Sequence, residues 1–131
     1  MMDTASMLVV DDNARTRQAL MAYLTTQAGI RVVAEASNGL EACSMIKEQI
    51  PDIVLMDARM PVMDGLEATR IIKKSWPQIM IVLMTMYPDY QAEALSAGVD
   101  AFLVKGSPVD EMMRTIHELL QAEGEGIYHP E

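Results

Sequence analysis

The chain has 131 residues, half of them hydrophobic, and its 19 acidic and 10 basic side chains give a formal net charge of −9. This length and apolar content predict one domain with a buried core. The acidic balance argues against direct binding of this segment to nucleic acid, which requires a basic face. The single cysteine, Cys43, excludes an internal disulfide and a multi-cysteine zinc site.

The sequence carries no pattern for export or membrane insertion. Residues 1–6 lack the basic region and long apolar stretch of a signal peptide. No apolar run approaches the roughly 20 residues that a membrane span requires. We therefore expect a cytoplasmic protein without a membrane partner.

Strand and helix patterns alternate five times along the chain. Short apolar runs with polar boundaries indicate buried strands, and amphipathic stretches between them indicate helices. Strands are predicted near 6–11, 31–36, 52–57, 79–85 and 100–105, and helices near 14–28, 39–49, 64–75, 89–97 and 108–122. The alternation is typical of an α/β domain with a parallel sheet between two layers of helices. The second strand contains Arg31 and Glu35, so it is predicted at an edge.

The last residues differ in composition from the rest. Glu123-Gly124-Glu125-Gly126 is polar and rich in glycine, as flexible linkers are. We therefore predict a domain over residues 1–122 and the start of a linker over residues 123–131.

Polar side chains follow four of the five predicted strands at the point where each strand ends. The first run leads into Asp11 and Asp12, the third into Asp57, the fourth into Thr85 and the fifth into Lys105. Ligands of open parallel sheets bind outside the carboxyl ends of the strands, so these five residues are expected in one pocket. Three acids, a hydroxyl and an amine suit a divalent cation and a phosphoryl group.

These motifs together resemble the receiver domain of bacterial two-component response regulators. The resemblance rests on Val9-Val10-Asp11-Asp12-Asn13, on residues 57–65 (Asp-Ala-Arg-Met-Pro-Val-Met-Asp-Gly), on Thr85, and on residues 98–105 (Gly-Val-Asp-Ala-Phe-Leu-Val-Lys). It implies a flavodoxin-like fold, with a five-stranded parallel sheet in the order 2-1-3-4-5 flanked by five helices. It also implies that a histidine kinase donates a phosphoryl group to one aspartate, which then changes a partner surface.

The resemblance assigns the acids. Asp57 corresponds to the phosphoacceptor, a carboxylate nucleophile that forms an acyl phosphate. Mg²⁺, or Mn²⁺, would be bound directly by Asp12 and Asp57, through water by Asp11, and by the backbone carbonyl of Arg59. The domain would catalyse its own phosphorylation and dephosphorylation and would not be a turnover enzyme.

Three further residues correspond to the phosphoryl-binding and switch positions of the family. Lys105 would bind one phosphoryl oxygen and the hydroxyl of Thr85 another. Phe102 stands where the family has an aromatic switch residue. A strand-end threonine and a core phenylalanine are the structural alternatives for Thr85 and Phe102, and a core role for Phe102 is compatible with a switch.

The chain also departs from many receivers. Met86 stands where a small residue is common, and Arg59 and Tyr87 occupy the two positions that tune self-dephosphorylation in the family. Large groups there suggest a long-lived phosphorylated state. Gly106 stands where proline is common, so we expect a trans peptide bond after Lys105.

These departures resemble the NarL/FixJ subfamily, in which a receiver precedes a LuxR-type helix-turn-helix domain. The tail Gly126-Ile127-Tyr128-His129-Pro130-Glu131 is similar to the linker of that subfamily. The resemblance implies a longer transcription regulator that contacts DNA through a domain absent from this chain, and a homodimer formed on phosphorylation. A stand-alone receiver that acts through protein contacts is the alternative.

Two other classes share parts of the pattern. A flavodoxin-like FMN module needs phosphate-binding donors after the first strand, where this chain has Asp11 and Asp12. A phosphohydrolase with an aspartate nucleophile usually has a second acid two residues on, where this chain has Arg59. Both therefore fit less well than a receiver.

Overall fold

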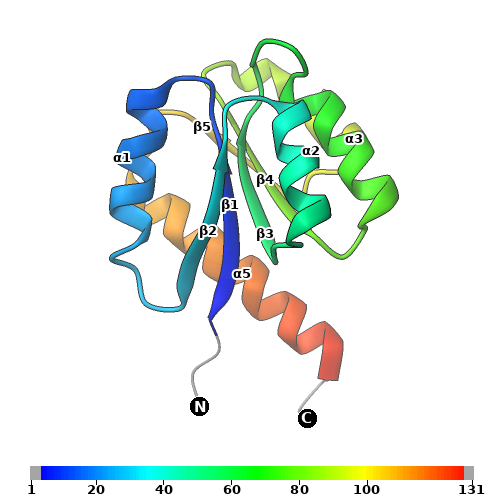
Figure 1. Ribbon diagram of the computed structural model, residues 1–131. Helices are drawn as coiled ribbons and strands as arrows, with labels where there is room; N and C mark the ends of the chain where they lie inside the picture. Colours follow the sequence, from blue (N-terminus) through cyan, green and yellow to red (C-terminus); the bar gives the residue numbers. More distant parts are fainter. Residues whose placement is uncertain (1–3, 129–131) are drawn as a thin grey trace.

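The structure is a computed structural model that describes residues 4–128. It contains one five-stranded parallel sheet in the order β2-β1-β3-β4-β5 (Figure 1). The strands are β1 (Ala5–Val10), β2 (Ile30–Ala36), β3 (Ile53–Asp57), β4 (Met80–Thr85) and β5 (Ala101–Val104). The helices are α1 (Ala14–Leu24), α2 (Gly39–Glu48), α3 (Gly65–Ser75), α4 (Gln91–Ala97) and α5 (Val109–Tyr128). The predicted fold class, strand order and edge position of β2 are therefore confirmed.

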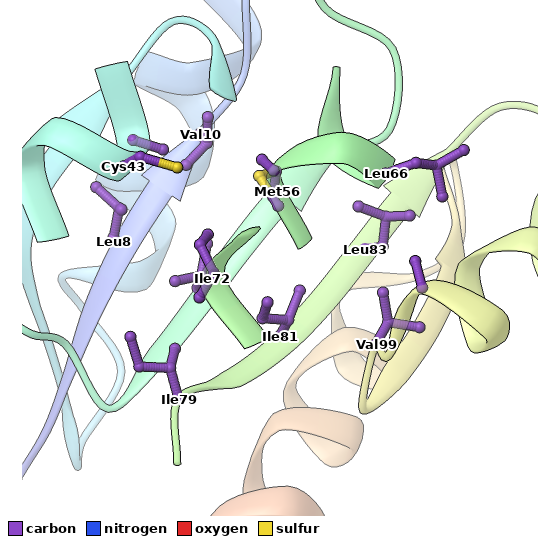
Figure 2. Close-up of a cluster of buried hydrophobic side chains, with 14 of the residues drawn as sticks. Leu8, Val10, Cys43, Met56, Leu66, Ile72, Ile79, Ile81, Leu83 and Val99 are labelled. Carbon is purple, nitrogen blue, oxygen red and sulfur yellow. The ribbon is translucent and has the colours of Figure 1, made fainter. Parts of the chain in front are cut away.

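Two hydrophobic cores lie on opposite faces of the sheet. Successive residues of a strand point to opposite faces, so Leu8 and Val10 of β1 join one core, and Met7 and Val9 join the other. Helices α2, α3 and α4 cover the first core, part of which Figure 2 shows, and α1 and α5 cover the second. The strands are therefore buried on both faces, as their apolar runs predict. Full burial of each large aliphatic side chain contributes about 1.5–3 kcal/mol to stability.

Side-chain caps begin α1, α2 and α3, the helices that follow the first three strands. Asn13, Asn38 and Asp64 each accept a hydrogen bond from the backbone N–H three residues on, at 2.9, 2.8 and 2.9 Å. Such a cap satisfies an amide that the first turn of a helix would leave unpaired. The caps of α1 and α3 therefore fix the ends of the loops that follow Asp11, Asp12 and Asp57.

The sheet ladder brings the strand ends to the same level. Asp57 of β3 lies opposite Met84 of β4, and Thr85 lies opposite Val104 of β5. Backbone hydrogen bonds continue beyond the strands, since the Lys105 N–H donates to the Thr85 carbonyl at 2.7 Å. The carboxyl ends of β3, β4 and β5 therefore open onto one edge of the sheet.

Several boundaries differ from the predictions. Helix α1 ends at Leu24 rather than near residue 28, and α5 continues to Tyr128 rather than ending near Ala122. Each residue added to an existing helix gains a hydrogen bond, so isolated glycines weaken a helix without always ending it. The predicted linker over 123–131 is thus helical through Tyr128, and its last residues, 129–131, lie outside the described residues.

Two smaller expectations can be checked against the described residues. No peptide bond in residues 4–128 is cis, so the bond after Lys105 is trans, as expected. Within the same range, none of the helices combines the length and the apolar content that crossing a bilayer would require.

The backbone between β3 and α3 packs closely against two glycines, Gly39 and Gly65, and contains one strained residue, Val62. A Cβ at Gly65 would lie 2.3 Å from the Asp57 carbonyl oxygen, and one at Gly39 would lie 2.7 Å from the Met63 carbonyl oxygen. Val62 has φ +71°, and the Met63 N–H donates to the Pro61 carbonyl at 2.8 Å, which closes a three-residue turn around it. A β-branched residue rarely adopts positive φ, so this turn stores strain beside the site.

Relieving that strain should stabilise the protein. Val62 is 75% exposed, so Val62→Asn loses little burial and introduces a side chain that tolerates positive φ. We expect the free energy of unfolding to rise by about 1 kcal/mol in urea titrations. Val109→Asn, which alters an exposed valine of ordinary φ, is the control and should give no comparable gain. Equal changes in both variants would contradict strain at Val62.

Candidate phosphoryl and metal site

Three carboxylates meet at the carboxyl edge of the sheet. Asp11 and Asp12 follow β1, Asp57 ends β3, and one oxygen from each lies within 4.8 Å of the others. Asp11 is fully buried and Asp57 is 7% exposed, whereas Asp12 is exposed at the mouth of the cluster. The structure thus brings together the three acids that the sequence predicted as neighbours.

Lys105 joins two of these acids. Its Nζ donates hydrogen bonds to Oδ2 of Asp11 and Oδ2 of Asp57, both at 3.1 Å. The ammonium therefore offsets the two buried carboxylates and leaves the exposed Asp12 on the open side. These residues are 94 and 48 positions from Lys105 in the chain, so only the fold brings them into contact.

Every polar group of Asp11 is engaged. Its Oδ1 accepts from the Asn13 N–H at 2.9 Å, and its own N–H donates to the Ala36 carbonyl at 3.1 Å. Its carbonyl oxygen accepts from Nη1 of Arg17 at 2.6 Å. Sequence reasoning missed Arg17 and Asn13 as site residues. Asn13 directly follows the acid pair at the N-cap of α1, which could have indicated it, whereas no local pattern marks Arg17.

The pKa values of Asp57 and Lys105 are both raised, for different reasons. Burial raises the pKa of the Asp57 carboxyl, an effect that the neighbouring Lys105 charge opposes and the Asp11 charge reinforces. Burial alone would lower the pKa of the Lys105 ammonium, but its hydrogen bonds and charge interactions with Asp11 and Asp57 outweigh burial and raise the pKa. Lys105 therefore remains charged at neutral pH, while the ionised form of Asp57 carries an energetic cost.

Thr85 lies at the same edge of the sheet and is buried. Its Oγ1 accepts a hydrogen bond from the Tyr87 N–H at 3.1 Å. This bond occupies a lone pair, so the hydroxyl hydrogen can still be donated to an oxygen in the site. Phe102 is half-buried on β5 opposite Leu83 and packs against the core beneath α2, α3 and α4.

Exposed side chains of two loops line one side of the site. The Arg59 guanidinium carbon lies 5.2 Å from the ring centroid of Tyr87, a cation–π contact, and the Tyr87 and Tyr90 ring centroids are 5.8 Å apart. Met86 is 67% exposed next to them. An open cavity of about 460 Å³ lies below, between Asp12, Arg59 and Tyr90.

The donor set fits a hard divalent cation. Carboxylate oxygens are ligands that Mg²⁺ accepts, and Mg²⁺ often takes only one or two protein carboxylates together with waters. Asp12 is exposed, and the adjoining cavity is open to solvent, so water could complete such a shell. The cluster therefore has the chemistry of a metal site next to a nucleophile and an ammonium group.

A family model and the curated relatives of this chain both belong to the response regulators. The response regulator receiver domain model matches residues 7–117. The response regulator protein VraR of Staphylococcus aureus is 37% identical over 130 residues, which cover 98% of this chain and 61% of that protein. The chain thus spans about three fifths of the length of the curated relatives that it matches.

Solved structures agree in fold and sequence. The crystal structure of a LuxR-family two-component response regulator from Aurantimonas sp. SI85-9A1 aligns with a TM-score of 0.87 and 32% identity, over 92% of this chain and 87% of that one. A LuxR-family DNA-binding response regulator from Staphylococcus aureus aligns with a TM-score of 0.82 and 30% identity, over 87% and 97% of the two chains.

Removing the Asp57 charge should stabilise the metal-free domain. The raised pKa means that the folded state binds a proton at Asp57 more tightly than the unfolded state, so ionisation at neutral pH costs stability. In chelator at pH 7, Asp57→Asn should raise the free energy of unfolding by about 1 kcal/mol, mainly because a neutral amide avoids the burial cost of a carboxylate and in smaller part because repulsion from Asp11 is removed.

The pH dependence checks the cause. The gain should shrink as the pH falls through the raised pKa, because the wild-type carboxyl then also becomes neutral. Asp89→Asn removes an exposed charge outside the cluster and should leave stability nearly unchanged. A less stable Asp57→Asn protein at pH 7 would show that the ion pair with Lys105 outweighs burial.

Proposed function

Because the chain belongs to the response regulator receiver family, we propose that it accepts a phosphoryl group from a histidine kinase on Asp57. The observation that carries this proposal is the Lys105 ammonium, which bridges Asp57 and Asp11 at 3.1 Å while Asp12 lies within reach of both acids. This arrangement provides a nucleophile, an ammonium group beside it and a place for a metal ion. Phosphoryl transfer depends mainly on such positioning and charge neutralisation.

The proposed transfer uses groups that the chain supplies. The Asp57 carboxylate attacks phosphorus, a P–O bond forms, and the bond between phosphorus and the kinase histidine breaks with its electron pair returning to the ring nitrogen. Lys105 Nζ already lies against Asp57, so it can shift to an oxygen of the incoming phosphoryl group. The Thr85 hydroxyl, at the end of the neighbouring strand, can donate to another.

Asp12 and Asp57 would bind Mg²⁺, or Mn²⁺, directly, with Asp11 acting through water and the Arg59 carbonyl as a further ligand. The ion would neutralise charge on the acids and the phosphoryl oxygens. Asp11 is fully buried and each of its carboxylate oxygens already accepts a hydrogen bond from the protein, which supports an indirect role for it.

We further propose that phosphorylation changes a surface near Thr85 and Phe102. Thr85 accepts one hydrogen bond, from the Tyr87 N–H, and Phe102 is only half-buried, which supports these two residues as the groups that move. A switch requires such an element with two arrangements.

The output is proposed to be transcription control through an attached LuxR-type helix-turn-helix domain. The LuxR-family relatives and the three-fifths coverage of the curated proteins support it. Phosphorylation would then favour a homodimer, as a two-fold DNA site requires. A stand-alone receiver that acts through protein contacts is the alternative. The sequence of the full-length gene distinguishes the two, because only the first requires a region that encodes a helix-turn-helix domain.

Hydrolase and flavin functions fit less well. Arg59 lies two residues after Asp57, with its guanidinium against Tyr87, where a phosphohydrolase would have a second acid. The first loop offers the carboxylates of Asp11 and Asp12 to a flavin phosphate, which they would repel. We therefore propose a phosphoacceptor rather than a turnover enzyme.

A small phosphodonor with Mg²⁺ tests the acceptor. We expect intact mass to show one phosphoryl group per chain, stable in acid and labile in base, and Asp57→Asn to abolish it. The matched control Asp89→Asn, an exposed acid near the site, should retain it. Labelling that survives in Asp57→Asn, or steady turnover of a generic phosphate ester, would argue against the receiver function.

Met86 provides a test of the phosphorylated lifetime. Met86 follows Thr85 in the chain, precedes Tyr87 of the cation–π pair and is exposed, and we propose that its side chain limits access of water to the acyl phosphate. Met86→Ala should accelerate phosphate loss at least about threefold, a change of roughly 0.6 kcal/mol in the barrier. Leu95→Ala, an exposed apolar residue of α4, is the control. An unchanged rate in Met86→Ala would remove Met86 from the rate-tuning set.

A further inference from the structure

We propose that Arg17 is a positioning residue for the metal ligand Asp12, which it orients through the backbone of Asp11. The inference rests on the proposed metal-dependent phosphoryl transfer and adds a residue to it. Arg17 lies in α1, outside the cluster of acids and outside the set of residues that the motifs identify.

The guanidinium of Arg17 bridges the loop after β1 and strand β2. Its Nη1 donates to the Asp11 carbonyl at 2.6 Å, and its Nε donates to Oε1 of Glu35 on β2, also at 2.6 Å. The Arg17 side chain is only 16% exposed, although it is charged. A planar fork held at both ends has little freedom to move.

The contact controls Asp12 because of the geometry of the peptide bond. The Asp11 carbonyl belongs to the peptide group that joins Asp11 to Asp12, and this group is planar. Holding the carbonyl oxygen therefore fixes the plane from which the Asp12 backbone continues. Asp12 itself is exposed, so its carboxylate depends on that backbone for its orientation.

The same loop is anchored to α1 at a second point. Asn13 caps the helix through its side chain, and its carbonyl accepts from the Arg17 N–H at 2.9 Å. Arg17 thus contacts the loop through both its backbone and its guanidinium. Arg17 and the Asn13 cap therefore both tie the acids that follow β1 to the first turn of α1.

The ion pair with Glu35 reduces the repulsion that the Arg17 charge would otherwise exert on a bound metal ion. A free cation beside a metal site repels Mg²⁺, and the repulsion is appreciable at short range. The ion pair with Glu35 neutralises Arg17, so the fork can position the loop without opposing the metal. Loss of either partner should therefore weaken metal binding.

Arg17→Lys separates positioning from charge, because it keeps the charge and removes the fork. We expect Mg²⁺ affinity, measured by calorimetry, to fall about tenfold, the lower end of the range for residues that orient metal ligands. The rate of phosphorylation at saturating Mg²⁺ should stay within about twofold of the wild type, since only binding is impaired. Glu35→Gln should also weaken Mg²⁺ binding, whereas Arg15→Lys, at an exposed position of the same helix, should not.

A second readout needs no metal. The Asn13 N–H donates to Asp11 in the held loop, so its hydrogen exchange in chelator should accelerate in Arg17→Lys, while Leu83 amide exchange in buried β4 stays unchanged. Equal acceleration at both amides would indicate general destabilisation and overturn the proposal. Unchanged Asn13 exchange together with unchanged Mg²⁺ affinity would overturn it as well.

The same measurements distinguish failure of the positioning role of Arg17 from failure of the proposed metal-dependent phosphoryl transfer. A wild-type protein that fails to bind Mg²⁺ refutes the proposed metal-dependent function, and the exchange comparison then decides the positioning role alone. Tighter Mg²⁺ binding in Arg17→Met would show that Arg17 acts only through its charge, which overturns positioning.

Discussion

The site depends on one interaction, the bridge that Lys105 makes between two buried carboxylates. Two buried carboxylates that lie this close together, as Asp11 and Asp57 do, need a compensating charge beside them. The ammonium group supplies that charge at 3.1 Å from each. Burial still raises the pKa of Asp57 despite the Lys105 charge, so a bound cation can further stabilise its ionised form. Binding of a metal ion or a phosphoryl group would therefore change the charge balance of this cluster.

The rest of the fold places those groups and keeps them in place. Parallel register puts the ends of β3, β4 and β5 at one level, and hydrogen bonds continue the ladder into the loops. Two glycines let the β3–α3 loop pack closely, with Gly65 against Asp57 and Gly39 against Met63. The strain at Val62 shows that the loop is held in a conformation that its own residues do not favour.

Much of this could be predicted because buried parallel strands leave a clear pattern. Their apolar runs indicated five strands, and polar residues at the ends of those runs indicated a shared pocket. Helix ends were less predictable, as α1 and α5 show, because propensity and packing compete over the last turns. The contacts of Arg17 were missed because nothing local distinguishes an arginine that bonds a loop carbonyl from one that is solvated.

The sequence by itself determined which residues stand at the strand ends and that they carry three acids, a hydroxyl and an amine. It did so because side-chain polarity along a buried strand is constrained by the sheet on either side. Only the tertiary structure decided that Lys105 meets Asp11 and Asp57, that Asp12 stays open, and that Arg17 meets Glu35. Those contacts join residues far apart along the chain, and their distances follow from strand order and register rather than from local pattern.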